Sequence, residues 1–191
     1  VNIMVSQIKV NEIIKQSGSS ITIGESGDTV SVPSGATLSV SGTASGQNYP
    51  MFQAARTSDQ STTSSSFTKI QFDTEEFDTG GFFDNTTNYR YTPLVAGKYF
   101  VYASVRIHDD ANDLLQYGIK IDKNGSQIKE NYNKGTANER GEITVVTIID
   151  MNGSSDYLEV YSWQVAGSGN PTIKGAAGDK ATSFGAYRLG S

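Results

Sequence analysis

The stretch Lys98-Tyr-Phe-Val-Tyr-Ala-Ser-Val-Arg-Ile107 is the longest run of strand-forming residues in the chain. Successive side chains of a β-strand point to opposite faces, so the odd-numbered residues from Tyr99 to Ile107 share one apolar face. Phe100 and Tyr102 place aromatic rings on the other face. A strand that is apolar on both faces is expected in a sandwich core or at a subunit contact, and it predicts a β protein.

Strand and turn signals of the same kind continue to the C-terminus. Asn124-Gly125 is the preferred centre of a type I′ hairpin turn, and it separates strands predicted over residues 116–123 and 126–129. Residues 142–151 are again apolar on both faces. Further strands are predicted over residues 52–55, 67–72, 157–165 and 181–189. From residue 50 onward we expect roughly eight to ten strands in an all-β, jelly-roll-type sandwich.

The composition argues against several classes of function. The 191 residues carry a net charge of −5 and no stripe of basic residues, so the chain is a poor candidate for binding nucleic acid or a membrane. Because there is no cysteine, neither disulfides nor thiolate metal sites are available, and we expect oligomerisation to supply stability. Neither a signal peptide nor an apolar run approaching the ~18 residues of a membrane span is visible.

Before residue 50 the pattern changes to short apolar–hydroxyl–apolar triplets with glycine-rich spacers. The triplets are Ile21-Thr22-Ile23, Val30-Ser31-Val32 and Leu38-Ser39-Val40. Each triplet turns two apolar side chains to the same side. A single short segment of this kind cannot bury those side chains alone. We therefore predict a β-stalk over residues 17–49 to which several chains contribute. The predicted trimer contacts in it are Ile21, Ile23, Val30, Val32, Leu38 and Val40. The alternative is a flexible Ser/Gly linker that contains these triplets by chance.

Several short segments after residue 50 have distinctive amino-acid sequences. They are Phe52-Gln53-Ala54, Lys69-Ile70-Gln71-Phe72-Asp73, residues 91–100 (Tyr-Thr-Pro-Leu-Val-Ala-Gly-Lys-Tyr-Phe), residues 156–160 (Asp-Tyr-Leu-Glu-Val) and residues 182–187 (Thr-Ser-Phe-Gly-Ala-Tyr). In these segments the chain resembles C1q/TNF-like domains, although Gly185-Ala186 stands where that family has Ser-Gly and no collagen-like stem is present. The resemblance implies a C1q-like jelly-roll head over residues 50–191 that forms a homotrimer. The trimer interface residues that it implies are Tyr99, Val101, Tyr157, Tyr161 and Trp163.

The N-terminal part carries a second resemblance. Residues 9–13 (Lys-Val-Asn-Glu-Ile), 19–24 (Ser-Ser-Ile-Thr-Ile-Gly) and 32–38 (Val-Pro-Ser-Gly-Ala-Thr-Leu) are similar to the N-terminal region of bacteriophage tail-fibre and other virion appendage proteins. This resemblance implies an attachment or adaptor segment over residues 1–16 that contacts other virion structural proteins. Together the two resemblances imply a trimeric fibre on the virion tail or an appendage, extracellular after release, with a C1q-like tip.

The sequence gives little support to catalysis. His108 is the only histidine and no Gly-x-Ser-x-Gly elbow occurs, which argues against His-rich zinc sites and a serine triad. The acidic stretch with Asp73, Glu75, Glu76 and Asp78 offers the oxygen ligands that calcium prefers, but its spacing matches no EF-hand loop. We therefore predict a non-enzymatic protein without a cofactor. These four carboxylates are kept as weak candidates for a calcium site, and the alternative is a solvated acidic loop.

Three polar segments, residues 109–116, 130–141 and 167–180, are the predicted sites of partner recognition. They are expected to be loops strung between rigid strands, where binding residues often lie. The residues predicted to contact a receptor are Asp110, Asn112, Tyr132, Asn133 and Lys134. The sequence thus predicts a virion fibre that binds a host-surface glycan or protein, with three sites in one trimer adding avidity.

Three other functions remain alternatives to a receptor-binding fibre. The chain would otherwise be a purely structural decoration or adaptor protein of the particle, which binding of the isolated head to host cells would exclude. A glycan-degrading tailspike would require a deep groove with two opposed carboxylates. A secreted C1q/TNF-like ligand is disfavoured by the missing signal sequence and collagen stem.

Overall fold

The computed structural model describes residues 13–14, 17–18, 20–40, 49–138 and 140–190. The chain separates into two units, Val1–Gly46 and Gln47–Ser191, and the second unit is called the head below. The described residues of the head form strands and connecting turns and contain no helix. Consequently, no helix capable of crossing a membrane is found in the part of the chain that the structure describes.

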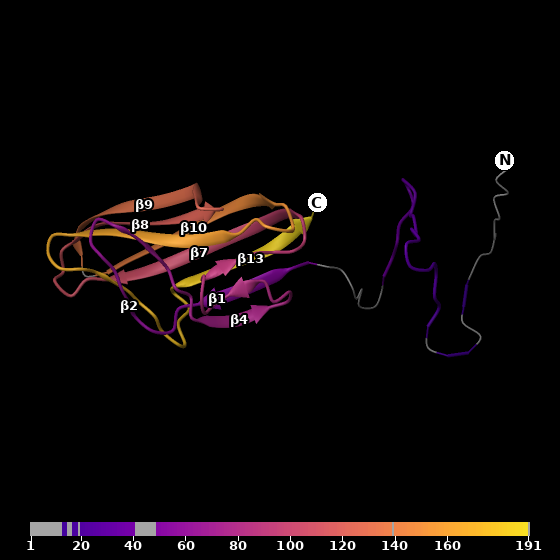
Figure 1. The fold of residues 1–191 in the computed structure, drawn as a ribbon, viewed down its shortest axis with the longest axis horizontal. Helices are drawn as coiled ribbons and strands as arrows, with labels where there is room; N and C mark the ends of the chain where they lie inside the picture. Colours follow the sequence, from indigo (N-terminus) through magenta and orange to yellow (C-terminus); the bar gives the residue numbers. More distant parts are fainter. Residues whose placement is uncertain (1–12, 15–16, 19, 41–48, 139, 191) are drawn as a thin grey trace. The chain divides into compact units, whose positions relative to one another are not determined.

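The described residues of the head form thirteen strands, labelled in Figure 1 where space allows. They are β1 (Met51–Ala55), β2 (Gln60–Ser61), β3 (Phe67–Lys69), β4 (Thr74–Asp78), β5 (Phe83–Asp84), β6 (Arg90–Tyr91), β7 (Gly97–His108), β8 (Leu114–Lys123), β9 (Ser126–Asn138), β10 (Arg140–Met151), β11 (Leu158–Ala166), β12 (Thr172–Ile173) and β13 (Ser183–Gly190). β7 to β11 are the long ones, and they carry most of the sandwich.

Two antiparallel sheets pack face to face. The seven-stranded sheet has the order β2-β12-β7-β13-β1-β4, and β10 pairs with β7 along the whole of its other side. The six-stranded sheet has the order β5-β6-β11-β8-β9, with β3 also paired to β11. The predicted all-β jelly-roll sandwich is thereby confirmed for the head.

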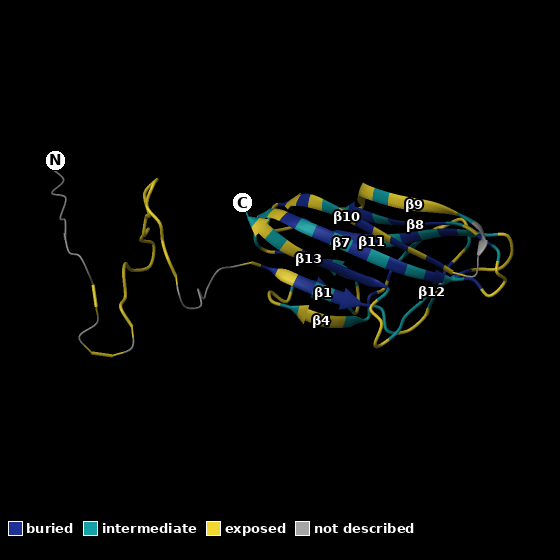
Figure 2. Ribbon diagram, turned by 180° about the vertical axis from the view of Figure 1, so that it is seen from behind, coloured by how far each residue is buried: buried dark blue, intermediate teal, exposed yellow. Residues whose placement is uncertain are grey.

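The core lies between the sheets and follows the alternation read from residues 98–107. The odd-numbered residues of β7, from Tyr99 to Ile107, have no exposed surface, whereas the even-numbered ones point to the outer face (Figure 2). Near the start of β7 an aromatic cluster closes the core, with the ring of Phe52 stacked 4.1 Å from Tyr91 and 5.0 Å from Phe83. Each large apolar side chain buried in this way contributes about 1.5–3 kcal/mol.

The hairpin between β8 and β9 turns at Asn124-Gly125, as predicted. Both residues have positive φ, 53° and 77°, which is the conformation that a type I′ turn requires. The Asn124 side chain holds the turn against the start of β11, because its Nδ2 donates to Asp156 Oδ1 (2.8 Å) and its Oδ1 accepts from the Tyr157 amide (2.9 Å). Residues 116–123 and the following strand are therefore fixed in register.

The predicted loop over residues 130–141 is wrong. β9 continues to Asn138 and β10 begins at Arg140, so the segment belongs to two long strands. β9 is rich in Asn, Lys and Glu, which have low strand propensity, and the ladder that it forms with β8 overrides that preference. The remaining two predicted loops, 109–116 and 167–180, contain the turns after β7 and β11.

The described residues of the first unit, 13–14, 17–18 and 20–40, form turns but no strand. Tight turns occur where Asp28 N donates to Glu25 O (3.0 Å) and Ala36 N donates to Pro33 O (3.1 Å). The six aliphatic side chains of the triplets are all exposed, because one chain offers them no neighbouring strand. A β-stalk made by several chains remains a prediction. The adaptor predicted over residues 1–16 lies outside the described residues except for positions 13 and 14.

Candidate binding surfaces of the head

An apolar band crosses the outer face of the seven-stranded sheet. Its members are exposed or half-buried residues that share this face: Met51, Phe77, Phe100, Tyr102, Val146, Ile148 and Tyr187. The strand register aligns them in two rows. One row runs Ile148–Phe100–Tyr187–Met51 across β10, β7, β13 and β1, and the other runs Val146–Tyr102–Gly185–Gln53–Phe77 and reaches β4.

The band is exposed in the single chain and well packed within itself. Ile148 is 58% exposed and Val146 50% exposed, while the Phe100 and Tyr187 rings lie 5.2 Å apart. The Tyr102 ring covers Gly185, and a Cβ added at position 185 would come within 2.5 Å of that ring. Burial raises the pKa of the Tyr102 hydroxyl. A glycine at position 185 therefore lets an aromatic ring lie flat on the sheet.

Ion pairs border the apolar band at both ends of β7. Lys98 Nζ lies 2.7 Å from Asp150 Oδ1 at the first end. Arg106 pairs with Glu142 (3.1 Å) and with Asp179 at the second end. An apolar centre inside a charged rim is the arrangement found in protein–protein interfaces.

The outer face of the six-stranded sheet carries a different feature, an aromatic groove. Residues Phe67, Trp163, Gly118 and Tyr132 stand in one register row across β3, β11, β8 and β9. Because Gly118 has no side chain, the row is interrupted in its third position. A hollow of about 390 Å³ results, lined by Phe67, Gln116, Glu130, Tyr132 and Trp163, and this hollow is called the aromatic groove below.

A polar network borders the aromatic groove along β11 and β8. Glu159 binds Lys69 (2.6 Å) and accepts a hydrogen bond from the Tyr161 hydroxyl (2.9 Å). Lys120 binds Asp122 (2.7 Å), and its Nζ lies 4.6 Å from the centre of the Phe67 ring. Burial and the hydrogen bond to Glu159 raise the pKa of Tyr161, so this residue is neutral and acts as a donor.

The predicted trimer interface in the head is wrong for Tyr99 and Val101. Both are fully buried between the sheets, so they have no surface to offer a partner. Tyr161 and Trp163 lie on the outer face of the six-stranded sheet, on the opposite side of the sandwich from the apolar band. Tyr157 packs its ring 4.5 Å from the Arg90 guanidinium. The five residues therefore do not share one face.

The residues predicted to bind a receptor are divided between the turn after β7 and the two faces of β9. Asp110 and Asn112 lie in the turn after β7, where Asp110 Oδ1 is 2.8 Å from His108 Nε2. Tyr132 is in β9 and is 63% exposed on the face of the aromatic groove. Asn133 alternates to the other side, where its Nδ2 donates to the Tyr117 hydroxyl (3.1 Å). Lys134 returns to the groove side, opposite Gln116.

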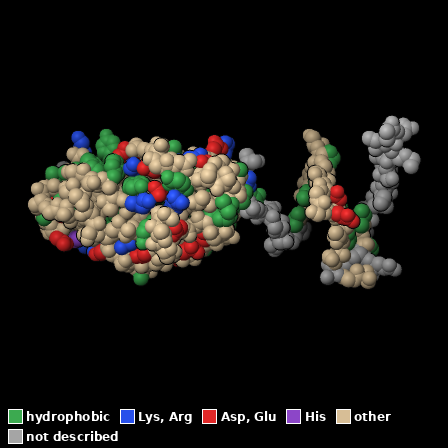
Figure 3. All heavy atoms as spheres, viewed as in Figure 1, with side chains coloured by type: hydrophobic (Ala, Val, Ile, Leu, Met, Phe, Trp, Pro, Cys, Tyr) green, Lys and Arg blue, Asp and Glu red, His purple; other side chains and the backbone are tan. Residues whose placement is uncertain are grey.

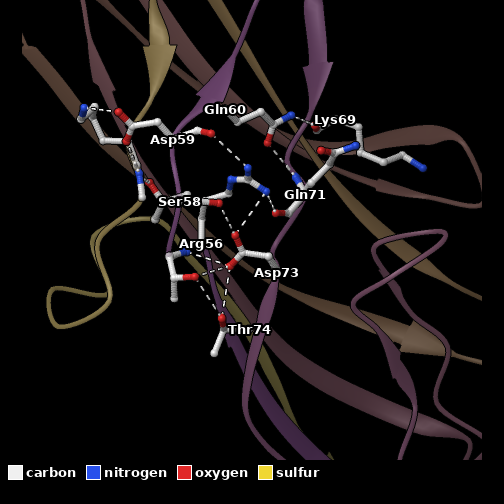
Figure 4. Close-up of polar contacts among 12 residues, drawn as sticks. Arg56, Ser58, Asp59, Gln60, Lys69, Gln71, Asp73 and Thr74 are labelled. Atoms are coloured by element: carbon white, nitrogen blue, oxygen red, sulfur yellow. Dashed lines mark hydrogen bonds and ion pairs between the residues drawn. The ribbon is translucent and has the colours of Figure 1, made fainter.

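The four acidic residues kept as calcium candidates do not converge. Figure 4 shows Asp73 beside Arg56. The Asp73 carboxylate accepts hydrogen bonds from Thr57, Ser58 and Thr74. Burial by itself would raise the pKa of Asp73, but the hydrogen bonds from Ser58 and Thr57 and the charge of Arg56 outweigh it and hold this pKa below its usual value.

Two of the other carboxylates also have protein partners. Glu76 binds Lys180, and Asp78 caps the turn at Gly80 and Gly81 (both 3.0 Å). Among the described residues no group of three or more acidic or histidine side chains is placed to hold an ion. The four residues kept as weak calcium candidates are therefore not gathered around one point in the described structure.

A small basic pocket of about 200 Å³ lies at the far end of β7. Arg106, His108, Arg140 and Lys174 line it. Lys174 pairs with Asp59, Arg106 with Asp179 and His108 with Asp110. These acidic partners offset much of the positive charge of the pocket. Acidic and basic side chains are intermixed over the visible face of the head (Figure 3).

Comparisons with known proteins bear on the fold. No protein-family model and no curated protein matches the sequence. The solved structure of murine APRIL at pH 5.0 is similar, with 12% identity and a TM-score of 0.56 over 74% of this chain and 100% of that chain, and murine APRIL at pH 8.0 gives the same values. The globular domain of zebrafish complement 1qA protein has 10% identity and a TM-score of 0.49 over 72% and 93% of the two chains. The likeness to APRIL shows a C1q/TNF-like jelly-roll fold.

Proposed function

We propose that the chain is a non-enzymatic fibre protein of a virion that assembles as a homotrimer and engages a host-surface receptor through its head. The apolar band is the observation that carries the assembly. Surfaces that are apolar and contiguous over several strands are uncommon on monomers and mark protein contacts. In this band the exposed aliphatic residues of β10 adjoin the aromatic residues of β7 and β13.

The first unit supports self-association independently. Ile21, Ile23, Val30, Val32, Leu38 and Val40 are between 45% and 72% exposed, so the described residues of their own unit leave them largely uncovered. Equivalent segments of two further chains would bury these side chains and pair the extended backbone. The segment before the triplets would then be available for contacts with other virion proteins.

In this proposal the seven-stranded sheet contacts the other subunits, and the six-stranded sheet is left for recognition. If the apolar band is used between subunits, the six-stranded sheet and the turns at the far end of β7 and β11 remain accessible. These turns are tied together, because Gly167 N donates to Asp113 O (3.0 Å) and the Ser168 hydroxyl donates to Asp113 Oδ2 (2.7 Å). Rigid loops and sheet faces of this kind are suited to receptor recognition. Three copies in one particle would add avidity.

Light scattering and native mass spectrometry of the whole chain test the assembly. The expected mass is three times the 20.5 kDa of one chain. A well-folded single copy at micromolar concentration would contradict the proposal. Binding of the fluorescently labelled protein to a panel of bacterial strains tests the receptor, and immunolabelling of intact particles tests the location. Particle labelling without cell binding would instead favour a structural decoration protein.

A further inference from the structure

We propose that the aromatic groove is a binding site for a neutral pyranose sugar, held between Trp163 and Tyr132 above Gly118. The inference rests on the proposed receptor-binding function and names the class of ligand. It requires no chemistry from the protein. The ligand would be one sugar unit of a surface glycan, contacted on its ring face and at its hydroxyl groups.

The floor of the groove is made by the absence of one side chain. In register, Gly118 of β8 pairs with Trp163 on one side and with Tyr132 on the other. A Cβ added at Gly118 would stand 3.1 Å from the Asn131 carbonyl oxygen and 3.2 Å from Tyr132 Cβ. Any larger residue would therefore fill the gap that separates the two aromatic walls. Phe67 extends the first wall, with its ring centre 6.5 Å from that of Trp163.

The chemistry of the walls matches the face of a sugar ring. A pyranose presents axial C–H groups on its face, and aromatic rings attract such groups because their own faces carry partial negative charge. The hollow, at about 390 Å³, is within the size range of small-ligand sites. Its aromatic residues remain accessible, with Tyr132 63% exposed and Phe67 46% exposed.

The polar residues that line the groove match the hydroxyl groups of a sugar. Gln116 offers an amide with two donors and one acceptor oxygen, and its side chain has no hydrogen-bond partner among the described residues. Glu130 offers a carboxylate, held by a hydrogen bond from Gln127 Nε2 (3.1 Å). A carboxylate accepts hydrogen bonds from hydroxyl groups and repels an anion, so a neutral sugar is expected to bind better than an acidic one.

The site is also held in place before any ligand arrives. Trp163 and Phe67 lie on paired strands, and Lys120 packs its ammonium over the Phe67 ring while bound to Asp122. Walls that are fixed by their neighbours lose little conformational freedom on binding, which favours affinity. The wall formed by Trp163 and Phe67 is therefore ordered although the groove is open.

Trp163 is the only tryptophan of the chain, so its fluorescence reports on this groove alone. Quenching by acrylamide in the full-length oligomer will first show whether the groove is open; a shielded Trp163 would mean that another copy covers it and would overturn the proposal. The open protein is then titrated with the methyl glycosides of glucose, galactose, mannose and N-acetylglucosamine, and with sialic acid. We expect a shift or quenching of emission with a Kd of roughly 1 mM for at least one neutral sugar.

Two substitutions on one strand provide the matched comparison. Tyr132→Ser removes a wall and is expected to weaken sugar binding by about tenfold or more. Ile128→Ser changes a residue of β9 that is 47% exposed and does not line the groove, and it is expected to leave binding unchanged. Gly118→Ala fills the floor and is expected to abolish the response of Trp163. Circular dichroism of each variant verifies that the fold is retained.

The outcomes separate this inference from the proposed function. If no neutral sugar changes the emission of Trp163, or if Tyr132→Ser binds sugar as well as the Ile128→Ser control does, the sugar site is refuted. Receptor binding would still stand if the trimer bound cells and the Tyr132→Ser variant bound them equally. Conversely, sugar binding that responds to Tyr132→Ser, in a protein that binds no cell, would support the site and count against the receptor function.

Discussion

Replacing Ile148 by aspartate should dissociate the proposed trimer without unfolding the head. Ile148 is 58% exposed on β10 and points away from the core, so the folded single chain should lose only about 1–2 kcal/mol of stability, from its partly buried fraction and the low strand propensity of aspartate. In a subunit contact, that exposed fraction would contribute about 1–2 kcal/mol. A carboxylate without a partner in the same place costs several kcal/mol more.

Over three subunits these effects add up to a loss on the order of 10 kcal/mol. For a trimer that dissociates to three monomers, the midpoint concentration varies as the square root of the dissociation constant, so this loss raises it by between about three and four orders of magnitude. Sedimentation velocity at protein concentrations of roughly 1–50 µM measures the change. The control is Ile128→Asp on β9, a residue of comparable exposure on the other sheet. A trimeric Ile148→Asp protein, or a monomeric wild type, would refute the reasoning.

Three further substitutions test individual contacts. Gly185→Ala should displace Tyr102 from the apolar band and cost about 1–3 kcal/mol, seen as a lower urea midpoint together with weaker association; an unchanged midpoint would contradict the contact. Gly153→Ala should destabilise the head more strongly, since φ is +71° and the new Cβ would stand 2.2 Å from the Ala96 amide nitrogen; thermal unfolding measures this. Hydrogen bonds from the Thr87, Thr86 and Asn88 amides lower the pKa of Asp84, so its stabilisation is present above the unfolded value of about 3.9 and is lost as the pH falls through the lower folded value. Asp84→Asn should therefore be less stable than the wild type at pH 7, and urea titrations should show the difference shrinking below about pH 4.

The alternation of apolar residues predicted β7 and its two faces, but not which face is the core. Both faces of 98–107 are apolar, and sequence period alone does not distinguish an interior from a subunit contact. The family resemblance predicts Tyr99 and Val101 at the interface, whereas the structure buries them and exposes Ile148 and Val146 of the paired strand instead. The apolar character of residues 142–151 on both faces was the signal that pointed to this strand.

The aromatic groove depends on information that is not local in the sequence. Gly118 in the middle of a predicted strand is the kind of residue that marks a close approach or a gap. The sequence does not reveal that Trp163 and Tyr132 flank it, because that requires the register of β8 with β11 and with β9. The hairpin at Asn124-Gly125 fixes one of these registers and was predicted, while the other arises only when the sandwich closes.

The pairing of β1 with β13 has a practical consequence for anyone labelling this protein. Met51 stands opposite Tyr187, so the chain leaves β13 beside the point where it begins β1 (Figure 1). A fluorescent protein or affinity tag joined after β13 would emerge at that end of the head. An epitope inserted between residues 109 and 113 would be displayed at the opposite end, where β7 finishes and β8 starts. The two positions allow a probe to be attached at either pole of the same sandwich.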